Sequence, residues 1–357
     1  MSNFTLKKIK TAWRKKNALF YGLLVPLSGL FWLLTSIRRL VYSAQILKSY
    51  ALSVPVIVVG NINVGGSGKT PVVIWLVEQL KSQGYKPAVI SRGYGGTINS
   101  STINGGTGKP PINVTSTSDP IIVGDEPVLV ASRCNCPVMV GADRVHVGLE
   151  LLKAYPECNV IISDDGLQHY RLKRDVEIAV VDGQYLHHAR LIPAGQLREP
   201  LSRLNTVDAI IKNTVLNKHA ENVDELDALP KSFSMQLVGD QFYNLANPTI
   251  KANAQDFKRK SIQAIAGIGN PKRFFEHLQQ LGMTFSGSSF EDHHAYTQQE
   301  LAKFDGDVLI MTEKDAVKCK PYAMAHHWVL PVEAQIDGAL MPLILKKISQ
   351  FKANIKE

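Results

Sequence analysis

The stretch Val54-Pro-Val-Ile-Val-Val59, together with Gly60-Asn-Ile-Asn-Val-Gly-Gly-Ser-Gly-Lys-Thr-Pro71 directly after it, decides the fold of this chain. The first part is a short, continuous apolar run rich in β-branched residues, which is typical of a parallel strand buried on both faces. A helix is predicted from Thr70 to Gln83. The order of strand, glycine-rich turn and helix predicts a phosphate-binding loop at the helix N-terminus.

The predicted loop matches the pattern G-x-x-x-x-G-K-[ST] at its last three positions, and Asn63 stands in place of the first glycine. Its glycines let backbone N–H groups point at phosphate oxygens. We expect Lys69 to contact the β- and γ-phosphates and the Thr70 hydroxyl to ligate Mg²⁺. The predicted nucleotide-binding residues are Asn63, Val64, Gly65, Gly66, Ser67, Gly68, Lys69 and Thr70.

Paired carboxylates end two further apolar runs, Val160-Ile-Ile-Ser-Asp164-Asp165 and Ile121-Ile-Val-Gly124-Asp125-Glu126, which are both predicted to be strands. Because the carboxyl ends of parallel strands meet at one edge of a sheet, we expect these acids to lie near the phosphate loop. Asp164 and Asp165 suit a hard divalent cation such as Mg²⁺. The site then holds more carboxylates than a metal needs, so one can act as a base toward an acceptor hydroxyl.

Strands and helices alternate from Val54 to Lys212, which predicts a doubly wound α/β sheet of the P-loop type. From about Leu229 the pattern predicts a second, smaller α/β lobe, and a final helix from Leu340 to Phe351 can return to the first domain. The predicted domains are 1–52 (N-terminal membrane-associated helices), 53–228 (phosphate-loop core), 229–337 (second lobe) and 338–357 (C-terminal helix). Further predicted strands are Pro87–Ser91, Pro137–Gly141, Val176–Asp182, Asp208–Lys212, Ser232–Leu237, Ile262–Gly267, Val308–Met311 and Trp328–Val332, and further predicted helices are Ala142–Tyr155 and Pro271–Leu281.

A polar insertion from Thr97 to Pro120 is predicted to be a mobile surface loop. It contains Gly105-Gly-Thr-Gly-Lys109-Pro110, which looks like a second phosphate loop. This copy has no Ser or Thr after its lysine, no strand before it, and two prolines in place of a helix. We therefore interpret it as loop.

Positive charge is concentrated at the N-terminus. The first 77 residues hold ten of the 40 Lys and Arg residues and no Asp or Glu, so the remainder has 30 basic and 31 acidic residues. The near-neutral charge of the residues after position 77 argues against nucleic-acid binding. The four cysteines make no disulfide framework in so long a chain and lack the spacing of a zinc site, which favours reduced thiols in the cytosol.

A run of 21 uncharged residues separates Lys16 from Arg38, and as a helix it would be about 30 Å long, close to the thickness of a bilayer core. The flanking basic residues favour contact with anionic lipid on the cytoplasmic side. The sequence leaves open a single span, an inserted hairpin or interfacial helix, and a buried core helix. A second stretch, Leu40–Leu52, also has helical apolar spacing.

Eight motifs follow one another in order along the chain. They are Gly60-Asn-x-x-Val-Gly-Gly-x-Gly-Lys-Thr-Pro71, Ser91-Arg-Gly-Tyr-Gly-Gly96, Gly124-Asp-Glu-Pro127, Gly141-Ala-Asp-Arg144, Asp164-Asp-Gly-Leu-Gln-His169, Pro193-Ala-Gly-x-Leu-Arg-Glu-Pro200, Asp292-His293 and Thr312-Glu-Lys-Asp-Ala-Val-Lys-Cys319. Together they resemble the tetraacyldisaccharide 4′-kinase family, the lipid A 4′-kinases of Gram-negative bacteria. The family's own pattern shares Asn63, and Thr97–Pro120 is the main stretch outside the resemblance.

The resemblance implies ATP-dependent phosphorylation of the 4′-hydroxyl of a tetraacylated glucosamine disaccharide 1-phosphate, giving lipid IVA, at the cytoplasmic face of the inner membrane. It also implies two α/β/α lobes joined by a thin strand linker, with ATP and Mg²⁺ as cofactors; no oligomeric partner is indicated. Carried over residue by residue, it implies a base, a histidine partner for that base, two Mg²⁺ ligands and further site residues. These are, in turn, Asp125, His293, Asp164 and Asp165, and Arg198 and Glu199, which join Lys69 of the phosphate loop among the predicted catalytic residues.

Two other classes of protein use a similar phosphate loop. A regulatory GTPase or metallochaperone predicts a guanine-reading Asn/Thr-Lys-x-Asp motif, and the nearest stretch, Thr312-Glu-Lys314-Asp315, lies in the second lobe with its lysine one place late. A non-enzymatic ATP-binding membrane adaptor has no use for Asp125 and His293. Within the kinase hypothesis, His294 adjoins His293 and is an alternative partner for Asp125.

Overall fold

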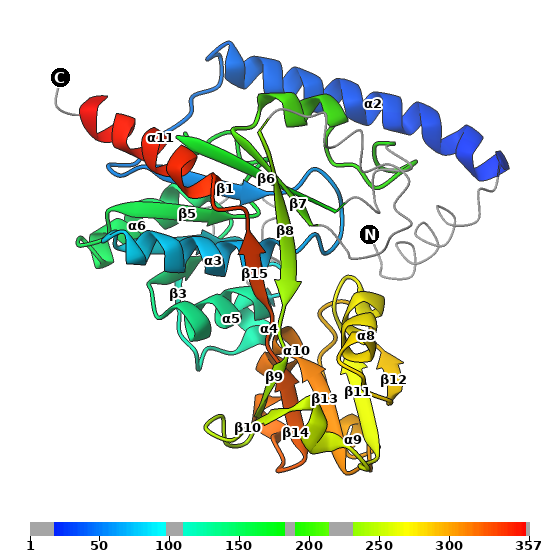
Figure 1. Ribbon diagram of the computed structural model, residues 1–357. Helices are drawn as coiled ribbons and strands as arrows, with labels where there is room; N and C mark the ends of the chain where they lie inside the picture. Colours follow the sequence, from blue (N-terminus) through cyan, green and yellow to red (C-terminus); the bar gives the residue numbers. More distant parts are fainter. Residues whose placement is uncertain (1–17, 98–109, 183–189, 214–230, 355–357) are drawn as a thin grey trace. The chain divides into compact units, whose positions relative to one another are not determined.

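The structure of the chain is a computed structural model that describes residues 18–97, 110–182, 190–213 and 231–354 (Figure 1). The predicted second glycine–lysine stretch at 105–109 and the basic residues before Ala18 lie outside the described residues. Contacts divide the chain into two compact units, each made of separate segments. Unit 1 comprises residues 1–69, 165–236 and 336–357, and unit 2 comprises 70–164 and 237–335. The predicted boundaries after residues 52, 228 and 337 follow the chain in sequence, whereas the contacts group segments that are far apart in it.

Unit 1 contains four parallel strands in the order β1-β6-β7-β8. The register places Ile57 opposite Val176 and Ile178 opposite Ala209. The side chains of β1, β6 and β7 are almost entirely buried, as expected for β-branched runs covered on both faces, whereas β8 alternates buried with exposed residues. The strands are β1 (Val56–Gly60), β6 (Val176–Asp182), β7 (Ala209–Asn213) and β8 (Ser232–Val238), and a 3₁₀-helix runs from Leu201 to Thr206.

Helix α11 (Leu340–Asn354), drawn in red in Figure 1, also belongs to unit 1, where it contacts β6. Lys347 Nζ on this helix lies 2.6 Å from Asp208 Oδ1. The C-terminal helix thus belongs to the same unit as β1.

Helix α2 (Ala18–Ser43) is the long blue helix in Figure 1 and belongs to unit 1. Its segment Leu24–Ser43 is long and apolar enough to cross a membrane by length and composition, and only 6% of the apolar window is buried. That low burial excludes the core-helix interpretation. The helix ends at Ser43, so the prediction of helical structure through Leu52 is wrong. The backbone of Tyr50 instead exchanges hydrogen bonds with the segment 171–173.

Unit 2 contains a sheet segment in the order β5-β2-β4-β3, in which β3 alone is antiparallel to its neighbour. Its strands are β2 (Pro87–Ser91), β3 (Ile112–Val114), β4 (Val138–Val140) and β5 (Val160–Asp164), and the associated helices are α3 (Lys69–Ser82), α4 (Pro120–Val123), α5 (Asp125–Cys134) and α6 (Arg144–Ala154). Part of the predicted Thr97–Pro120 loop is therefore a strand.

The predicted strand at Ile121–Val123 is wrong, because these residues form helix α4. The side chain of Asp119 accepts a hydrogen bond from the Ile121 N–H, and Pro120 occupies the first helical position, where its missing N–H costs nothing. Asp125 consequently begins helix α5 and does not follow a strand.

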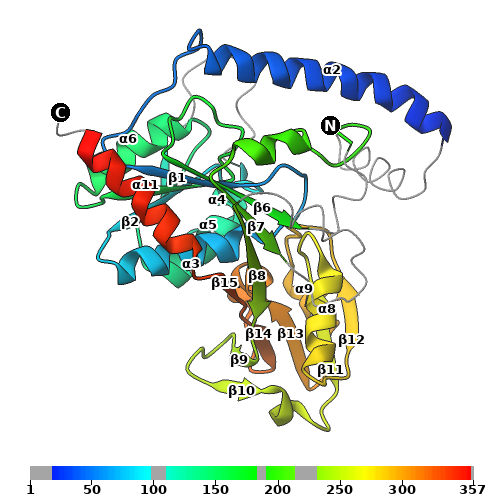
Figure 2. The same ribbon diagram turned by 45° about the horizontal axis from the view of Figure 1, so that its top comes forward.

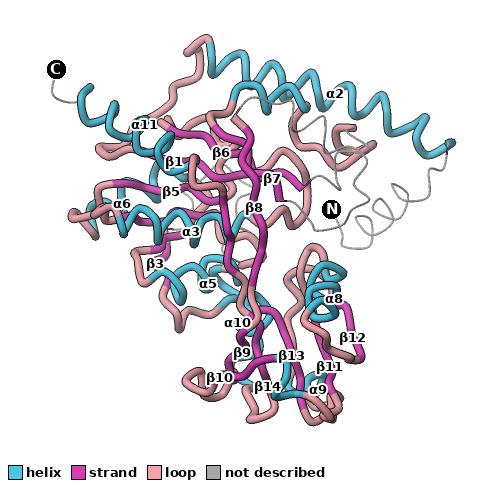
Figure 3. The backbone as a smooth tube through the Cα atoms, viewed as in Figure 1, coloured by secondary structure: helices cyan, strands magenta, loops and turns pink. Residues whose placement is uncertain are grey.

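A second sheet, of six strands, also lies in unit 2, in the order β10-β9-β14-β13-β11-β12 (Figure 3). One buried cluster centred on Phe242, Phe257 and Ile310 and another centred on Ile265, Leu309 and Met311 form its core. Helix α8 lies against β11 (Figure 2). The elements are β9 (Gln241–Asn244), β10 (Lys251–Asn253), β11 (Ile262–Ala266), β12 (Ser286–Ser289), β13 (Val308–Thr312), β14 (His327–Leu330), α8 (Pro271–Gln280), α9 (Gln298–Leu301) and α10 (Glu313–Cys319), with 3₁₀-helices at Ala254–Phe257 and Lys320–Tyr322. Strand β15 (Glu333–Ile336) neighbours β8 and is not part of this sheet.

Candidate active site

The predicted phosphate loop connects β1 to α3, and buried amides hold its shape. Asn61 Nδ2 donates to Ser67 Oγ at 3.2 Å, and Asn213 Nδ2, at the end of β7, donates to the Ser67 carbonyl at 3.2 Å. Gly68 has φ +89°, and a Cβ there would lie 2.7 Å from Asn213 Nδ2. Only glycine therefore fits this position, which leaves the backbone open to an incoming ligand.

Asn63, the residue that replaces the first glycine of the general pattern, is 2% exposed. Neither atom of its side-chain amide has a hydrogen-bond partner among the described residues. An unsatisfied buried amide costs about 1–3 kcal/mol. The residues therefore fit a polar ligand that reaches this loop and completes those bonds.

Lys69 and Arg198 meet at one carboxylate in unit 1. Lys69 Nζ lies 3.5 Å from Asp165 Oδ1, and Arg198 donates to Asp165 Oδ2 at 3.0 Å. All three side chains are between 12% and 27% exposed, so ligand phosphates can approach them. The structure thus brings together three of the residues that the sequence singles out.

Glu199 is 4% exposed and lies inside a hydrogen-bonded network. Its Oε2 accepts a hydrogen bond from the Tyr170 hydroxyl at 2.8 Å and forms an ion pair with Arg203, whose Nε lies 3.2 Å away. Burial and the Glu199 charge raise the pKa of Tyr170 to about 12, so the phenol remains a donor. Sequence reasoning missed Tyr170 and Arg203, although one directly follows the Asp164–His169 motif and the other lies one helical turn after Glu199.

The two candidate metal-binding acids are consecutive, but they belong to different units. Asp164 ends β5 and is 2% exposed; Ser91 Oγ donates to its Oδ2 at 3.4 Å. Thr70, the third candidate, is the second residue of α3 and is partly exposed. Two carboxylates and a hydroxyl are the oxygen donors that Mg²⁺ takes up beside substrate phosphates and water. Among the described residues no three His, Cys, Asp or Glu side chains make an all-protein metal cluster.

Asp125 and His293, which are 168 residues apart in the sequence, contact each other in unit 2. His293 Nδ1 lies 2.9 Å from Asp125 Oδ1 and 3.1 Å from Oδ2. His293 has φ +63°, a left-handed conformation that is uncommon for non-glycine residues. His294 instead places Nε2 3.3 Å from Glu300 Oε1, so of the two histidines His293 is the one that contacts Asp125.

The charge state of this pair follows from its surroundings. Burial would raise the pKa of Asp125, but the hydrogen bond from His293 and the charges of Lys314, His293 and Lys318 outweigh it and hold the pKa below its ordinary value. Burial would lower the pKa of His293, yet the hydrogen bond to Asp125 and the charges of Asp125 and Asp292 raise it above its ordinary value, against the opposing charge of Lys314. Asp125 is therefore ionised at neutral pH.

Helix α10 supplies lysines that the sequence reasoning did not assign to the site. Lys314 Nζ lies 2.9 Å from Glu126 Oε1 and 3.0 Å from Asp292 Oδ1, and Lys318 Nζ lies 3.8 Å from Asp125 Oδ2. Both belong to the motif Thr312–Cys319, which was compared above with a guanine-reading motif. Lys314 and Lys318 are four residues apart and therefore lie on one face of a helix. This spacing was the sequence signal that could have assigned both lysines to the site of Asp125.

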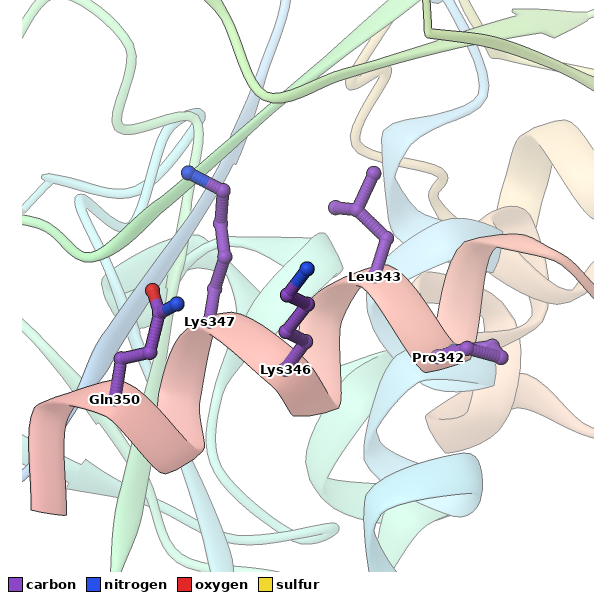
Figure 4. A pocket seen from close by; sticks show the side chains of 5 residues that line it. All are labelled: Pro342, Leu343, Lys346, Lys347 and Gln350. Atoms are coloured by element: carbon purple, nitrogen blue, oxygen red, sulfur yellow. The ribbon is translucent and has the colours of Figure 1, made fainter. Parts of the chain in front are cut away.

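A pocket away from these residues lies on α11 in unit 1 (Figure 4). It is lined by Pro342, Leu343, Lys346, Lys347 and Gln350, and Figure 4 shows these side chains on successive turns of the helix. No residue predicted for the site lines it.

The family profile described as "Tetraacyldisaccharide-1-P 4'-kinase" matches residues 20–349. The chain belongs to this family. Its match includes the phosphate loop, Asp125, Asp164, Asp165 and His293 within one continuous range.

Named relatives agree with the assignment to the tetraacyldisaccharide-1-phosphate 4′-kinase family. The chain is 44% identical to a tetraacyldisaccharide 4′-kinase of Methylobacillus flagellatus over 92% of both chains. It is 45% identical to the Pasteurella multocida protein of the same name, over 93% of this chain and 96% of that one. The crystal structure of LpxK from Aquifex aeolicus in complex with ATP superposes with a TM-score of 0.76 at 28% identity, covering 92% of this chain and 99% of that one.

These comparisons confirm the predicted fold class, since the solved kinase shares the architecture over nearly the whole chain. They also confirm the resemblance found in the eight motifs and place the chain among kinases of lipid A biosynthesis. The regulatory GTPase and the adaptor are thereby set aside.

Proposed function

We propose that this chain transfers the γ-phosphate of ATP to the 4′-hydroxyl of tetraacyldisaccharide 1-phosphate, giving lipid IVA. The observation that carries the proposal is the buried contact between Asp125 and His293, in a chain that belongs to a kinase family and carries a phosphate loop. Phosphoryl transfer to an alcohol needs a positioned base for the hydroxyl proton. A phosphate-binding adaptor or switch has no such need.

In the proposed reaction Asp125 accepts the proton of the 4′-hydroxyl while that oxygen forms a bond to the γ-phosphorus. The bond between the γ-phosphorus and the bridging β–γ oxygen breaks, and ADP leaves. His293 orients the carboxylate through its Nδ1 contact. The imidazole is neutral in the reactive state, because an imidazolium would lower the basicity of Asp125 further.

The phosphate loop and its neighbours are proposed to hold ATP. Asn63 and the loop backbone contact the phosphates, and Lys69 contacts the β- and γ-phosphates. Arg198, which is paired with Asp165, binds the phosphates beside Lys69. Mg²⁺, held by Thr70, Asp164 and Asp165, would neutralise charge on the phosphates when bound. Glu199 acts through its neighbour: because Tyr170 and Arg203 lock its carboxylate, it fixes the backbone from which Arg198 extends.

The protein is proposed to work at the cytoplasmic face of the bacterial inner membrane, held by α2. Ser28 Oγ donates to the Leu191 carbonyl at 2.8 Å and accepts from the Ala194 N–H at 2.9 Å. Farther along α2, Tyr42 packs against Tyr170 with ring centroids 5.9 Å apart. Contacts near the middle of the helix and at its C-terminal end favour a helix that lies along unit 1 in the plane of the lipid surface over a helix that projects through the bilayer.

The experiment is a phosphate-transfer assay with the full-length protein, γ-labelled ATP, Mg²⁺ and tetraacyldisaccharide 1-phosphate in mixed micelles. We expect label in the disaccharide at the 4′ position and, in Lys69→Ala, a rate lower by about 10²–10³-fold, as for loss of one electrostatic stabiliser. An exposed lysine elsewhere, Lys272→Ala, is the matched control and should retain full activity. Transfer to no disaccharide hydroxyl, or equal activity in the Lys69 variant, would contradict the proposal.

A further inference from the structure

Lys318 is a buried cation beside the Asp125 carboxylate. Its side chain is 7% exposed, and its Nζ lies 3.8 Å from Asp125 Oδ2, on the oxygen that makes the longer of the two contacts with His293. Lys318 comes from α10, whereas Asp125 begins α5 and His293 follows β12. Buried lysines are rare unless paired, so this position needs a physical reason.

A second carboxylate holds the ammonium group in place. Asp315 Oδ1 lies 3.0 Å from Lys318 Nζ, and the Gly267 carbonyl lies 3.5 Å from it. Asp315 is fully buried and accepts hydrogen bonds from the Gly267 N–H and from the hydroxyls of Thr312 and Tyr296. Because these three donors already fix the Asp315 carboxylate, Lys318 is held in one geometry at little further cost in side-chain entropy.

The Asp315 carboxylate also contacts the segment that carries His293. Tyr296 lies three residues after His293, and its hydroxyl donates to Asp315 Oδ1 at 3.1 Å. At Gly267 a Cβ would lie 2.8 Å from the Tyr296 hydroxyl and 3.0 Å from Asp315 Oδ1, so the backbone approaches this cluster closely. Asp315 and Lys318 thus connect the base to the loop of its partner histidine.

Charged and titratable groups face the pair from each element packed around it. Lys314, Asp315 and Lys318 do so from α10, Glu126 from α5, Asp292 from the loop after β12, and Tyr94, with its ring centroid 5.2 Å from that of His293, from the loop after β2. Lys314 lies between Glu126 and Asp292 and is close to both. Of the two lysines, Lys318 is the one whose Nζ lies within 4 Å of the Asp125 carboxylate.

We propose that Lys318, held by Asp315, is a positioning residue for the general base: its charge keeps the Asp125–His293 pair free of a resting proton at working pH and holds the carboxylate in place. This inference rests on the proposed function, because it assigns Lys318 a part in the same reaction. An opposite charge at about 4–6 Å typically lowers the proton affinity of a carboxylate by about 1–3 pH units. Asp315 offsets part of that charge, so the lower end of the range applies.

The test is the pH dependence of kcat/KM for Lys318→Met and Lys318→Arg. In Lys318→Met we expect the acid limb to move up by about one pH unit, which lowers kcat/KM about tenfold on that limb and much less above it. Lys318→Arg keeps the charge, so its limb should stay near that of the unchanged protein. The exposed Lys320→Met, two residues on, is the matched control. A loss that is equal at every pH would mean a purely structural role and would overturn the proposal.

Asp315→Asn gives a prediction of opposite sign. Removing this negative charge leaves Lys318 to act on the pair undiminished, so the acid limb should move to lower pH. The amide can still accept part of the hydrogen bonds from Gly267, Thr312 and Tyr296. If the acid limbs of Lys318→Met and Asp315→Asn moved in the same direction, the proposal would be overturned.

A readout without substrate separates this inference from the proposed function. The titration of the His293 imidazole can be followed by NMR in histidine-labelled protein, with the signal assigned by its loss in His293→Gln. We expect the midpoint to rise in Lys318→Met and fall in Asp315→Asn even if a variant is inactive. Unchanged midpoints in folded variants overturn the role of Lys318, whereas a protein that shifts as expected but transfers no phosphate to the disaccharide overturns the proposed function.

Discussion

At the scale of single residues, the contact between Asp125 and His293 is the feature on which the proposed chemistry depends. Asp125 is 3% exposed, and its only acidic neighbour in the first turn of α5 is Glu126, which pairs with Lys314. The pair therefore has little water to exchange protons with. Its two groups are expected to act as one unit.

Replacement of the two residues singly and together tests that unit. Asp125→Asn should abolish turnover but spare ATP binding, and His293→Gln should lower kcat by about 10²–10⁴-fold. Because both changes remove the same function, the double variant should be little worse than Asp125→Asn alone. Steady-state kinetics and nucleotide titration provide the measurements. If the loss of kcat in the double variant equalled the product of the two single losses, the residues would act separately.

The raised pKa of His293 predicts where activity is lost in acid. Reaction needs the neutral imidazole, so kcat/KM should rise with pH as the imidazolium loses its proton, at an apparent pKa above the ordinary value of about 6.5. The midpoint belongs to the pair and not to either group alone. In His293→Gln this limb should vanish and leave only the limb of the Asp125 carboxylate, at lower pH. A limb unchanged by the substitution would assign it to another group.

At the scale of elements, α2 presents a row of exposed apolar side chains. Leu27, Leu30, Leu34 and Ile37 are each 48–58% exposed, and their spacing places them on one face of the helix. A soluble surface seldom exposes such a continuous apolar stripe unless something covers it. We propose that membrane lipid contacts this apolar face of α2.

Leu30→Gln with Leu34→Gln should therefore weaken binding to lipid vesicles by roughly 30–1,000-fold, since each inserted leucine contributes about 1–2 kcal/mol. The KM for ATP should not change, because unit 1 holds the phosphate loop by contacts that do not involve this face. Vesicle sedimentation gives the measurement. As a control, Leu149→Gln with Ile250→Gln replaces two equally exposed apolar residues on other elements. Equal losses in both double variants would mean that α2 has no special part.

At the scale of the whole molecule, the uneven charge predicts how binding responds to lipid and salt. The first 77 residues carry no acidic side chain, while the rest of the chain is nearly neutral. Each basic residue near an anionic surface contributes about 1 kcal/mol, and salt screens this contribution. Binding should thus be several-fold tighter to anionic than to neutral vesicles, and the difference should disappear in about 1 M salt. A preference that survives at high salt would contradict an electrostatic origin.

Much of this protein could be predicted from its sequence because the responsible signals are local. The β-branched run before Gly60 and the glycines after it predict a buried strand and a phosphate loop, and the structure has β1 and α3 at those positions. Strand β6 has the predicted bounds, Val176–Asp182. Order along the chain was likewise sufficient for the eight motifs that identified the family.

Only the tertiary structure decided how distant segments meet. The wrong strand prediction for the apolar triplet Ile121–Val123 is of a different kind, because the cap at Asp119 and the proline after it, which make it a helix, are local signals. Asp125 and His293 are 168 residues apart, and the choice of His293 over His294 depends on which ring faces the carboxylate. Glu199 is locked by Tyr170 and Arg203, and Lys318 reaches Asp125 from another helix. The physical reason is that periodicity and turn chemistry act over a few residues, whereas burial, pairing of charges and proton affinity depend on neighbours that chain folding alone brings within a few ångströms.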